Sequence, residues 1–186
     1  VPRFRKGVDE EVKGTLRGTA YHRFFEILNY DCCKDYNSIE KYLKTSVAAG
    51  KISEEYAGLI NLKRFEEFLQ TDLGKRMGSA YKKGLLFREQ PFIMELGADM
   101  IDKEYPSDEK ILVQGIVDAF FFENDKVYIV DYKTDRVEQG KAGEKALVER
   151  YHKQLELYAD TISRVTGKET GGCYIYSTCL KKEILI

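Results

Sequence analysis

The sequence predicts an α/β fold with a mixed central sheet, flanking helices and an N-terminal helical region. Two patterns indicate this class. Apolar residues recur at helical spacing in the front half of the chain, and the middle contains runs rich in β-branched and aromatic residues. A long helical segment and two short apolar runs complete the chain.

Four helices are expected in the front half. In the first helix, Leu16, Phe24 and Ile27 lie on one face and form a core stripe. The third begins at Ser53, a typical N-cap residue, and acids fill its first turn. The predicted ranges are Leu16–Asn29, Ser38–Ala48, Ser53–Leu69 and Thr71–Lys82.

Strands dominate the rest of the chain. The predicted strands are Leu85–Glu95, Ile111–Phe122, Lys126–Lys133, Gly172–Ser177 and Glu183–Ile186. A helix from Glu144 to Val165 separates the third strand from the fourth. The segment Arg136–Gly143 before that helix is polar and contains glycine, so we expect a mobile surface loop there.

The composition indicates one domain that spans residues 1–186. A chain of 186 residues with 43% hydrophobic content, 13 tyrosines and 10 phenylalanines can bury one substantial core. No apolar run approaches the roughly 20 residues of a membrane-spanning helix, and no signal peptide is visible. Because the chain starts Val-Pro-Arg without methionine, we expect it to be a piece of a longer protein.

A predicted hairpin brings two aspartates together. The polar break Glu123-Asn124-Asp125-Lys126 is short enough to close a turn between two strands. A turn centred on its two middle residues places Asp118 opposite Asp131 on one face, and Ile116 opposite Lys133. Opposed side chains lie roughly 5 Å apart, and two carboxylates among apolar neighbours are destabilising without a cation.

The composition of this pair predicts a hard divalent metal. Asp131 and Lys133 share a face of the strand, and Tyr132 points to the other side. Carboxylate oxygens with no thiolate nearby suit Mg²⁺ or Mn²⁺, which make a bound water acidic enough to attack phosphorus. Lys133 can hold that water or the scissile phosphate. The alternative is a buried Asp–Lys ion pair beside an unrelated aspartate.

Four ordered motifs resemble those of a known family. The hairpin carries the Asp-x(n)-Asp-Tyr-Lys-Thr-Asp pattern, and Gly18–Glu26 resembles a helical histidine motif. Arg88–Phe92 resembles the strand that opens the sheet, and Gln154–Tyr158 resembles a Gln-x-x-x-Tyr motif. Together they are similar to the PD-(D/E)XK (restriction-endonuclease-like) superfamily, in its RecB-like branch. The resemblance is greatest to the C-terminal nuclease domain of AddA-type helicase–nuclease subunits. Val117 stands before Asp118 where the family pattern has proline, a variation that this branch tolerates.

The resemblance implies a function and partners. It implies a Mg²⁺-dependent or Mn²⁺-dependent deoxyribonuclease, an exonuclease on single strands of DNA that a fused ATP-dependent helicase delivers. The process would be double-strand-break repair and recombination in the bacterial cytoplasm, and the partner would be an AddB-type subunit. The chain would then be the C-terminal nuclease domain of a longer helicase–nuclease.

The resemblance also assigns roles to residues. Metal ligands would be His22, Asp118, Asp131 and the backbone carbonyl of Tyr132. Lys133 would act with the two aspartates in catalysis. The substrate-binding residues would be Gln154 and Tyr158.

The residues themselves leave several of these roles open. A histidine among aromatic residues, such as His22, is more often simply packed. Glu26 can orient His22 or pair with Arg23. Tyr158 fits a buried helical stripe as well as a DNA contact, and Glu89 can contribute to the site or pair with Arg88 or Lys83.

The four cysteines do not indicate a metal cluster. Cys32 and Cys33 are adjacent, Cys173 and Cys179 lie near the C-terminus, and no Cys-x-x-Cys occurs. Relatives that carry an iron–sulphur cluster use one early cysteine and three late ones. We therefore expect free thiols and no cluster.

The formal net charge of −1 and the pI of about 6.2 argue against tight autonomous binding of nucleic acid. They agree with a nuclease to which a motor delivers DNA. The rival interpretation is a non-catalytic module that keeps the nuclease fold to bind DNA or dock a partner. A stand-alone restriction-type enzyme would need a dimer surface and a recognition element, and neither is visible in the sequence.

Overall fold

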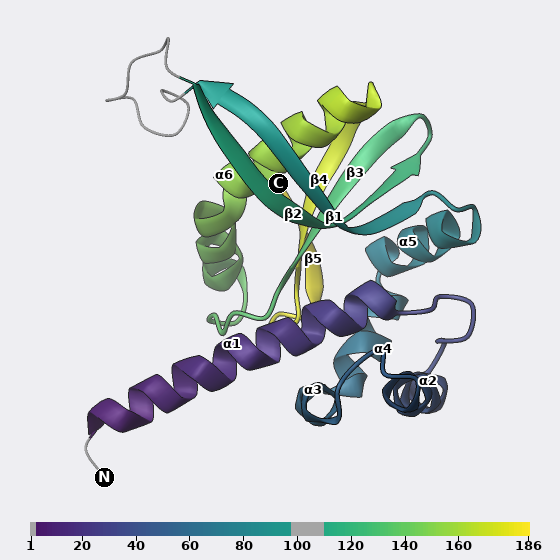
Figure 1. Cartoon of the computed structure of the whole chain (residues 1–186), viewed down its shortest axis with the longest axis vertical. Coiled ribbons are helices and arrows are strands. Elements are labelled where there is room, and N and C mark those ends of the chain that lie inside the picture. Colours follow the sequence, from purple (N-terminus) through teal and green to yellow (C-terminus); the bar gives the residue numbers. More distant parts are fainter. Residues whose placement is uncertain (1–2, 98–109) are drawn as a thin grey trace.

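The computed structural model describes residues 3–97 and 110–186, with side chains described for residues 14–95 and 110–186. Helices α1 to α5 form the front half and α6 lies between two strands (Figure 1). Their bounds are α1 Arg3–Ile27, α2 Tyr36–Ala48, α3 Glu54–Leu59, α4 Leu62–Gln70, α5 Asp72–Lys82 and α6 Lys141–Thr166. None of these helices combines the length and apolar character that crossing a bilayer requires.

Five strands form one mixed sheet in the order β1-β2-β3-β4-β5. Their bounds are β1 Leu86–Gly97, β2 Lys110–Glu123, β3 Lys126–Lys133, β4 Glu169–Ser177 and β5 Lys182–Leu185. Strands β3 and β4 pair in parallel, with α6 as the connection between them, and the other neighbours are antiparallel. The predicted α/β class with a mixed sheet and N-terminal helices is confirmed.

The predicted turn of the β2–β3 hairpin is confirmed. Asn124 and Asp125 both have positive φ, 50° and 64°, as a two-residue turn with matching twist requires. Paired residues run from Glu123–Lys126 to Ala119–Val130, the register that the sequence predicts. Asp118 and Asp131 come next in that register.

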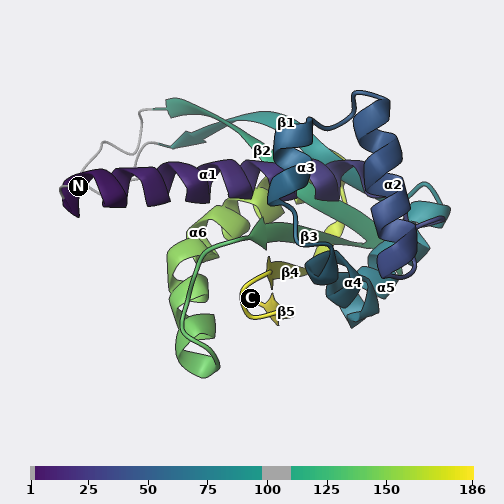
Figure 2. The same cartoon turned by 90° about the horizontal axis from the view of Figure 1, so that it is seen from below.

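Two predicted helices differ most from the structure, and α6 begins at Lys141, inside the segment predicted as a loop. The segment expected as one helix from Ser53 to Leu69 is two helices, because Ile60 takes an extended conformation. Asn61 then caps α4 by accepting a hydrogen bond from the backbone N–H of Lys63. Helix α1 begins at Arg3, well before the predicted Leu16, and is therefore a long helix of 25 residues (Figures 1 and 2).

The sheet has an apolar core on each side. Helices α1 to α5 cover one side and α6 covers the other (Figure 2). Alternation along β3 divides its side chains between the cores: Val127 and Ile129 meet α6, and Tyr132 enters the other core. There Tyr132 stacks flat on Phe25 of α1, with ring centroids 3.8 Å apart.

Arg76 of α5 joins the helical region to the inner strands of the sheet. Its guanidinium lies over the rings of Phe121, Tyr128 and Tyr174, at 4.3 to 5.6 Å from their centroids. The same group pairs with Glu123 at 2.7 Å. The guanidinium therefore satisfies its charge while its stem and face cover aromatic surface.

Arg76→Ala is expected to lower the free energy of unfolding by about 1–2 kcal/mol, since it removes the ring contacts and the ion pair. Urea unfolding followed by circular dichroism measures this loss. Arg164→Ala, which removes an exposed i,i+4 pair with Asp160 on α6, is the control and should change stability by less than about 0.5 kcal/mol. Equal losses in the two variants would contradict the role of Arg76.

Candidate metal centre and active site

Three carboxylates lie at one level across three neighbouring strands. They are Glu89 of β1, Asp118 of β2 and Asp131 of β3. The β1–β2 pairs on both sides of Glu89 and Asp118 are in register, and the last β2–β3 pair directly precedes Asp118 and Asp131. The sheet therefore places three acids side by side, and one of them, Asp131, is almost fully buried.

Glu89 has an unusual backbone conformation. Its φ is +49°, the left-handed region that non-glycine residues in strands rarely adopt. Phe87 stacks on Phe120, and Phe92 packs against Tyr158, so both rings face the core beneath α6. Residues five apart in a regular strand would face opposite sides. The strand thus reverses its orientation between these rings, and Glu89 lies at the reversal.

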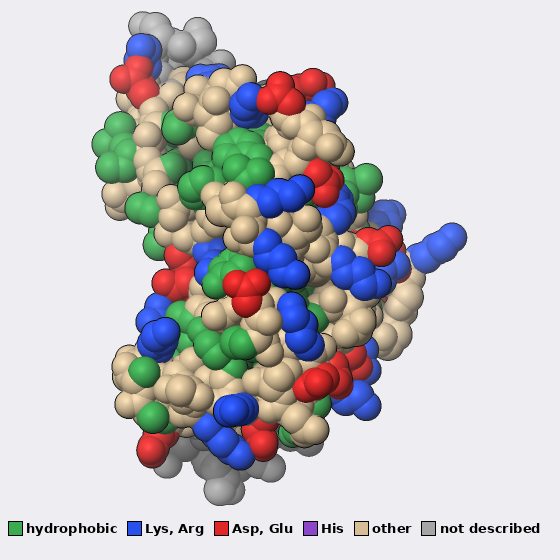
Figure 3. Space-filling view, turned by 90° about the vertical axis from the view of Figure 1, so that its right-hand side faces the viewer, with side chains coloured by type: hydrophobic (Ala, Val, Ile, Leu, Met, Phe, Trp, Pro, Cys, Tyr) green, Lys and Arg blue, Asp and Glu red, His purple; other side chains and the backbone are tan. Residues whose placement is uncertain are grey.

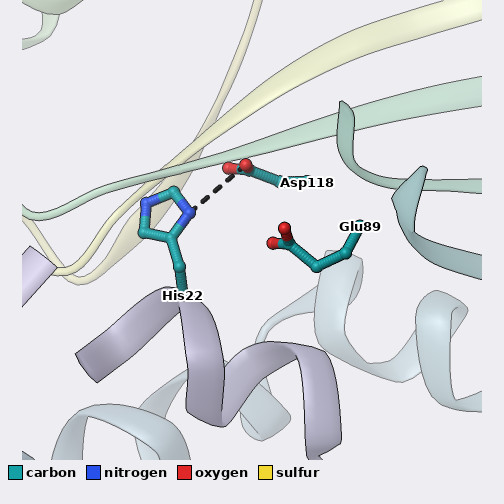
Figure 4. Close-up of side chains that lie close together, drawn as sticks. All are labelled: His22, Glu89 and Asp118. Carbon is teal, nitrogen blue, oxygen red and sulfur yellow. Dashed lines mark ion pairs between the residues drawn. The ribbon is translucent and has the colours of Figure 1, made fainter. Parts of the chain in front are cut away.

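His22 reaches the acids from α1. Its Nδ1 lies 3.2 Å from Oδ1 of Asp118. Figure 4 shows the side chains of His22, Glu89 and Asp118 converging from a helix and the sheet. Their ligand atoms all lie within 4.8 Å of one another. Gly18, one turn earlier on α1, allows this approach, because a Cβ there would come within 3.3 Å of the Thr134 hydroxyl.

The charges of the acids change the proton affinity of His22. Burial lowers the pKa of its imidazole, but the hydrogen bond with Asp118 and the charges of Asp118 and Asp131 outweigh burial. The net result is a raised pKa. The acids therefore favour the protonated imidazole, whose positive charge would partly compensate theirs.

Asp118 and Asp131 have separate partners. Oδ2 of Asp118 accepts a hydrogen bond of 2.8 Å from the backbone N–H of Tyr132. Oδ2 of Asp131 lies 2.7 Å from Nζ of Lys133. Burial, and next the charge of Asp118, raise the pKa of Asp131 to about 7, although Lys133 opposes the shift.

This donor set fits a hard cation. The oxygens of Glu89 and Asp118 and one imidazole nitrogen converge, and Asp131 lies next to them in the register. Burial, and next the charge of Asp118, raise the pKa of both Asp131 and Glu89. A divalent ion there would offset both effects, because it favours the ionised carboxylates. Metal binding by the backbone carbonyl of Tyr132 stays a prediction. The ring of Tyr132 lies in the core on the other side of the sheet.

The structure distinguishes the alternative roles of Glu26 and Glu89, which are a surface ion pair and a place at the site. Glu26 forms an ion pair with Arg23 on the same helix. Arg88 donates to the backbone carbonyls of Phe25 and Leu28, and the carboxylate of Glu89 lies with the side chains of His22 and Asp118.

Gln154 and Tyr158 lie beside the cluster on α6. The Gln154 amide donates to the Tyr158 hydroxyl at 2.6 Å. The Tyr158 ring packs edge-on against Phe92, and Gly115 makes room, since a Cβ there would lie 2.8 Å from the Phe92 ring. A groove of about 710 Å³ between α6 and strands β1 and β2 is lined by these residues and by Lys153.

One residue at the site was not predicted. The Nζ of Lys133 lies 4.1 Å from the centroid of the Tyr151 ring. The spacing of Tyr151, one helical turn before Gln154 on the same helix, is the signal in the sequence that could have identified it. Arg150, the residue before Tyr151, pairs with Asp135 at 2.6 Å.

Comparison with known proteins shows one consistent family. The sequence profile described as the PD-(D/E)XK nuclease superfamily matches residues 2–183. The A subunit of the ATP-dependent helicase/nuclease of Clostridium perfringens strain SM101 is 35% identical over 190 residues, covering 100% of this chain and 15% of that protein. The protein of the same name from Lachnoclostridium phytofermentans is 31% identical over 219 residues, covering 100% of this chain and 16% of the relative. That of Thermoanaerobacter sp. strain X514 is 37% identical over 163 residues, covering 86% and 13%.

In a buffer with a chelator, stability should fall as the pH rises from about 5 to about 8. The pKa of Asp131 is raised from 3.8 to about 7, so the native state keeps a proton that the unfolded chain has released. This contribution is complete below the unfolded value and is lost as the pH rises through the native value. The melting temperature across this pH range, measured by differential scanning fluorimetry, reports the slope.

Asp131→Asn should flatten that slope, because the titrating group is gone. Asp31→Asn, a change of an exposed aspartate, is the matched control and should leave the slope as it is in the wild type. An unchanged slope in the Asp131 variant would show that other groups carry the pH dependence.

Proposed function

Because the chain belongs to the PD-(D/E)XK nuclease superfamily, we propose that it hydrolyses phosphodiester bonds of DNA with a divalent metal ion. The observation that carries this proposal is the convergence of His22, Glu89 and Asp118 beside the Asp131–Lys133 pair. Buried like charges of this kind are stabilised by a bound cation. The expected ion is Mg²⁺, with Mn²⁺ as a substitute.

The acids and the histidine would hold the ion. Asp118 and Asp131 contribute carboxylate oxygens, His22 contributes an imidazole nitrogen, and the Tyr132 carbonyl is a further candidate. Glu89 joins this set on the geometry of the cluster. When bound, the ion would supply a more acidic water and stabilise charge on the phosphoryl oxygens.

Lys133 would position the attacking water or the scissile phosphate. Its ammonium lies beside Asp131, and the Lys133 side chain is only 13% exposed, so solvent screens its charge less than that of a surface lysine. Gln154 and Tyr158 would contact the DNA strand from α6. Through the groove that these two residues line, a DNA strand could reach this side of the sheet.

The biological setting is also a proposal. The chain spans only 13–16% of the length of the relatives named above, all of them helicase/nuclease subunits. We propose an exonuclease on single strands that a fused ATP-dependent helicase delivers, in double-strand-break repair and recombination, and the proposed partner is an AddB-type subunit. On the face in Figure 3, basic side chains alternate with acidic and apolar ones, and the net charge is −1. Such a surface supports the proposal that a helicase delivers the DNA rather than that this domain captures it by charge.

Asp131→Ala in the purified protein should lower cleavage of single-stranded DNA with Mg²⁺ or Mn²⁺ on the order of 10³-fold. Lys133→Ala should lower kcat similarly while leaving metal binding intact. Release of acid-soluble nucleotides measures the rate, circular dichroism verifies folding, and Asp31→Ala is the control. Undiminished cleavage by a folded Asp131 variant would contradict the assignment.

Metal binding separates a nuclease from a non-catalytic module. Glu89→Gln should weaken Mn²⁺ binding roughly tenfold in calorimetry, since it removes one carboxylate from the cluster. Asp118→Asn should remove most of the binding heat. A module that only docks a partner would show no divalent-dependent heat that these substitutions alter.

A further inference from the structure

The ammonium of Lys133 is held on two sides. On one side Asp131 lies 2.7 Å away, and on the other the face of the Tyr151 ring lies with its centroid 4.1 Å away. The ring comes from α6, and the lysine comes from the end of β3. A cation at this distance from an aromatic face is attracted by the electrons of the ring.

Tyr151 is itself held in place. Its hydroxyl donates to Oδ1 of Asp135 at 2.8 Å, and the same oxygen accepts from Arg150 at 2.6 Å. Asp135 lies two residues after Lys133, in the segment that leads from β3 to α6. The segment after the lysine therefore folds back onto the helix and fixes the ring over the ammonium.

We propose that Tyr151 is a positioning residue that holds the Lys133 ammonium toward the scissile phosphate through the face of its ring. This inference rests on the proposed function, because it assigns Tyr151 a part in the same reaction. The substrate class is the same phosphodiester, and Tyr151 acts only through Lys133.

The physical need for such a residue follows from the chemistry of the site. A lysine side chain is flexible. The carboxylate that pairs with Lys133, that of Asp131, is also expected to bind the metal ion. When that carboxylate binds a divalent cation, its hold on the ammonium weakens and the two cations repel each other. An aromatic face attracts the ammonium but is a poor ligand for a hard cation. The ring can therefore keep Lys133 in place in the metal-bound state.

A merely structural role for Tyr151 has a different signature. If the side chain served only to anchor the segment through Asp135, the hydroxyl would matter and the ring face would not. Tyr151→Phe keeps the ring and removes the hydroxyl, while Arg150 still holds Asp135. Tyr151→Leu keeps an apolar side chain and removes the aromatic face.

The first test uses NMR and needs no activity. The protein is labelled with ¹³C at the lysine ε-carbons, and the Lys133 signal is assigned by its absence in Lys133→Ala. The ring current should place the ε-proton signal of Lys133 upfield of the other lysines, with or without Mg²⁺. The shift should persist in Tyr151→Phe and vanish in Tyr151→Leu. A Lys133 signal at the ordinary lysine position with Mg²⁺ present would overturn the proposal.

The second test is kinetic. Tyr151→Leu should lower kcat roughly 10-fold on single-stranded DNA with KM unchanged, and Tyr151→Phe should restore most of that loss. Tyr36→Leu, a change of an exposed tyrosine on α2, is the matched control. Equal losses in the Leu and Phe variants would overturn the proposal, because they would assign the effect to the hydroxyl.

The two levels of inference fail separately. If Asp131→Ala or Lys133→Ala cleaves as fast as the wild type, the proposed function fails. The NMR shift then reports only whether the Tyr151 ring holds the Lys133 ammonium. If both of those variants lose activity and Tyr151→Leu does not, the function stands and the role of Tyr151 is refuted.

Discussion

The repulsion among three neighbouring carboxylates is the constraint on which this structure depends. Glu89, Asp118 and Asp131 lie at one level of three strands, and the last is almost fully buried. Each of the groups around them reduces the cost of that arrangement. The Tyr132 N–H donates to Asp118, and Lys133 pairs with Asp131. Burial, and next the charge of Asp118, still raise the pKa of Asp131 although Lys133 opposes the shift.

The fold brings the remaining groups to this line of acids from both sides. Helix α1 contributes His22 and approaches closely because Gly18 has no side chain to collide with Thr134. Helix α6 contributes Tyr151 to the lysine, as well as the hydrogen-bonded pair of Gln154 and Tyr158. The two helices lie against opposite cores of the sheet, and Glu89, at the reversal of β1, lies with His22 and Asp118.

The sequence was sufficient where local chemistry decides. The register of the β2–β3 hairpin followed from a two-residue turn at Asn124 and Asp125 and from strict alternation, so the approach of Asp118 to Asp131 could be predicted. Glu89 could be placed near the site only by resemblance, because its left-handed backbone has no signal in an ordinary strand sequence. The break at Ile60 was missed because apolar periodicity continues through it, and the cap at Asn61 is recognisable only when the helix is already known to end.

By itself, the sequence determined the order of helices and strands apart from the break at Ile60, the acids of the hairpin and the family of the chain. Alternation, turn chemistry and motif spacing act over a few residues and are therefore legible along the chain. Only the tertiary structure decided which groups of different elements meet: His22 with Asp118, Arg150 with Asp135, and the ring of Tyr151 with Lys133. The geometry of those contacts depends on how α1 and α6 pack on a twisted sheet, which no local pattern specifies.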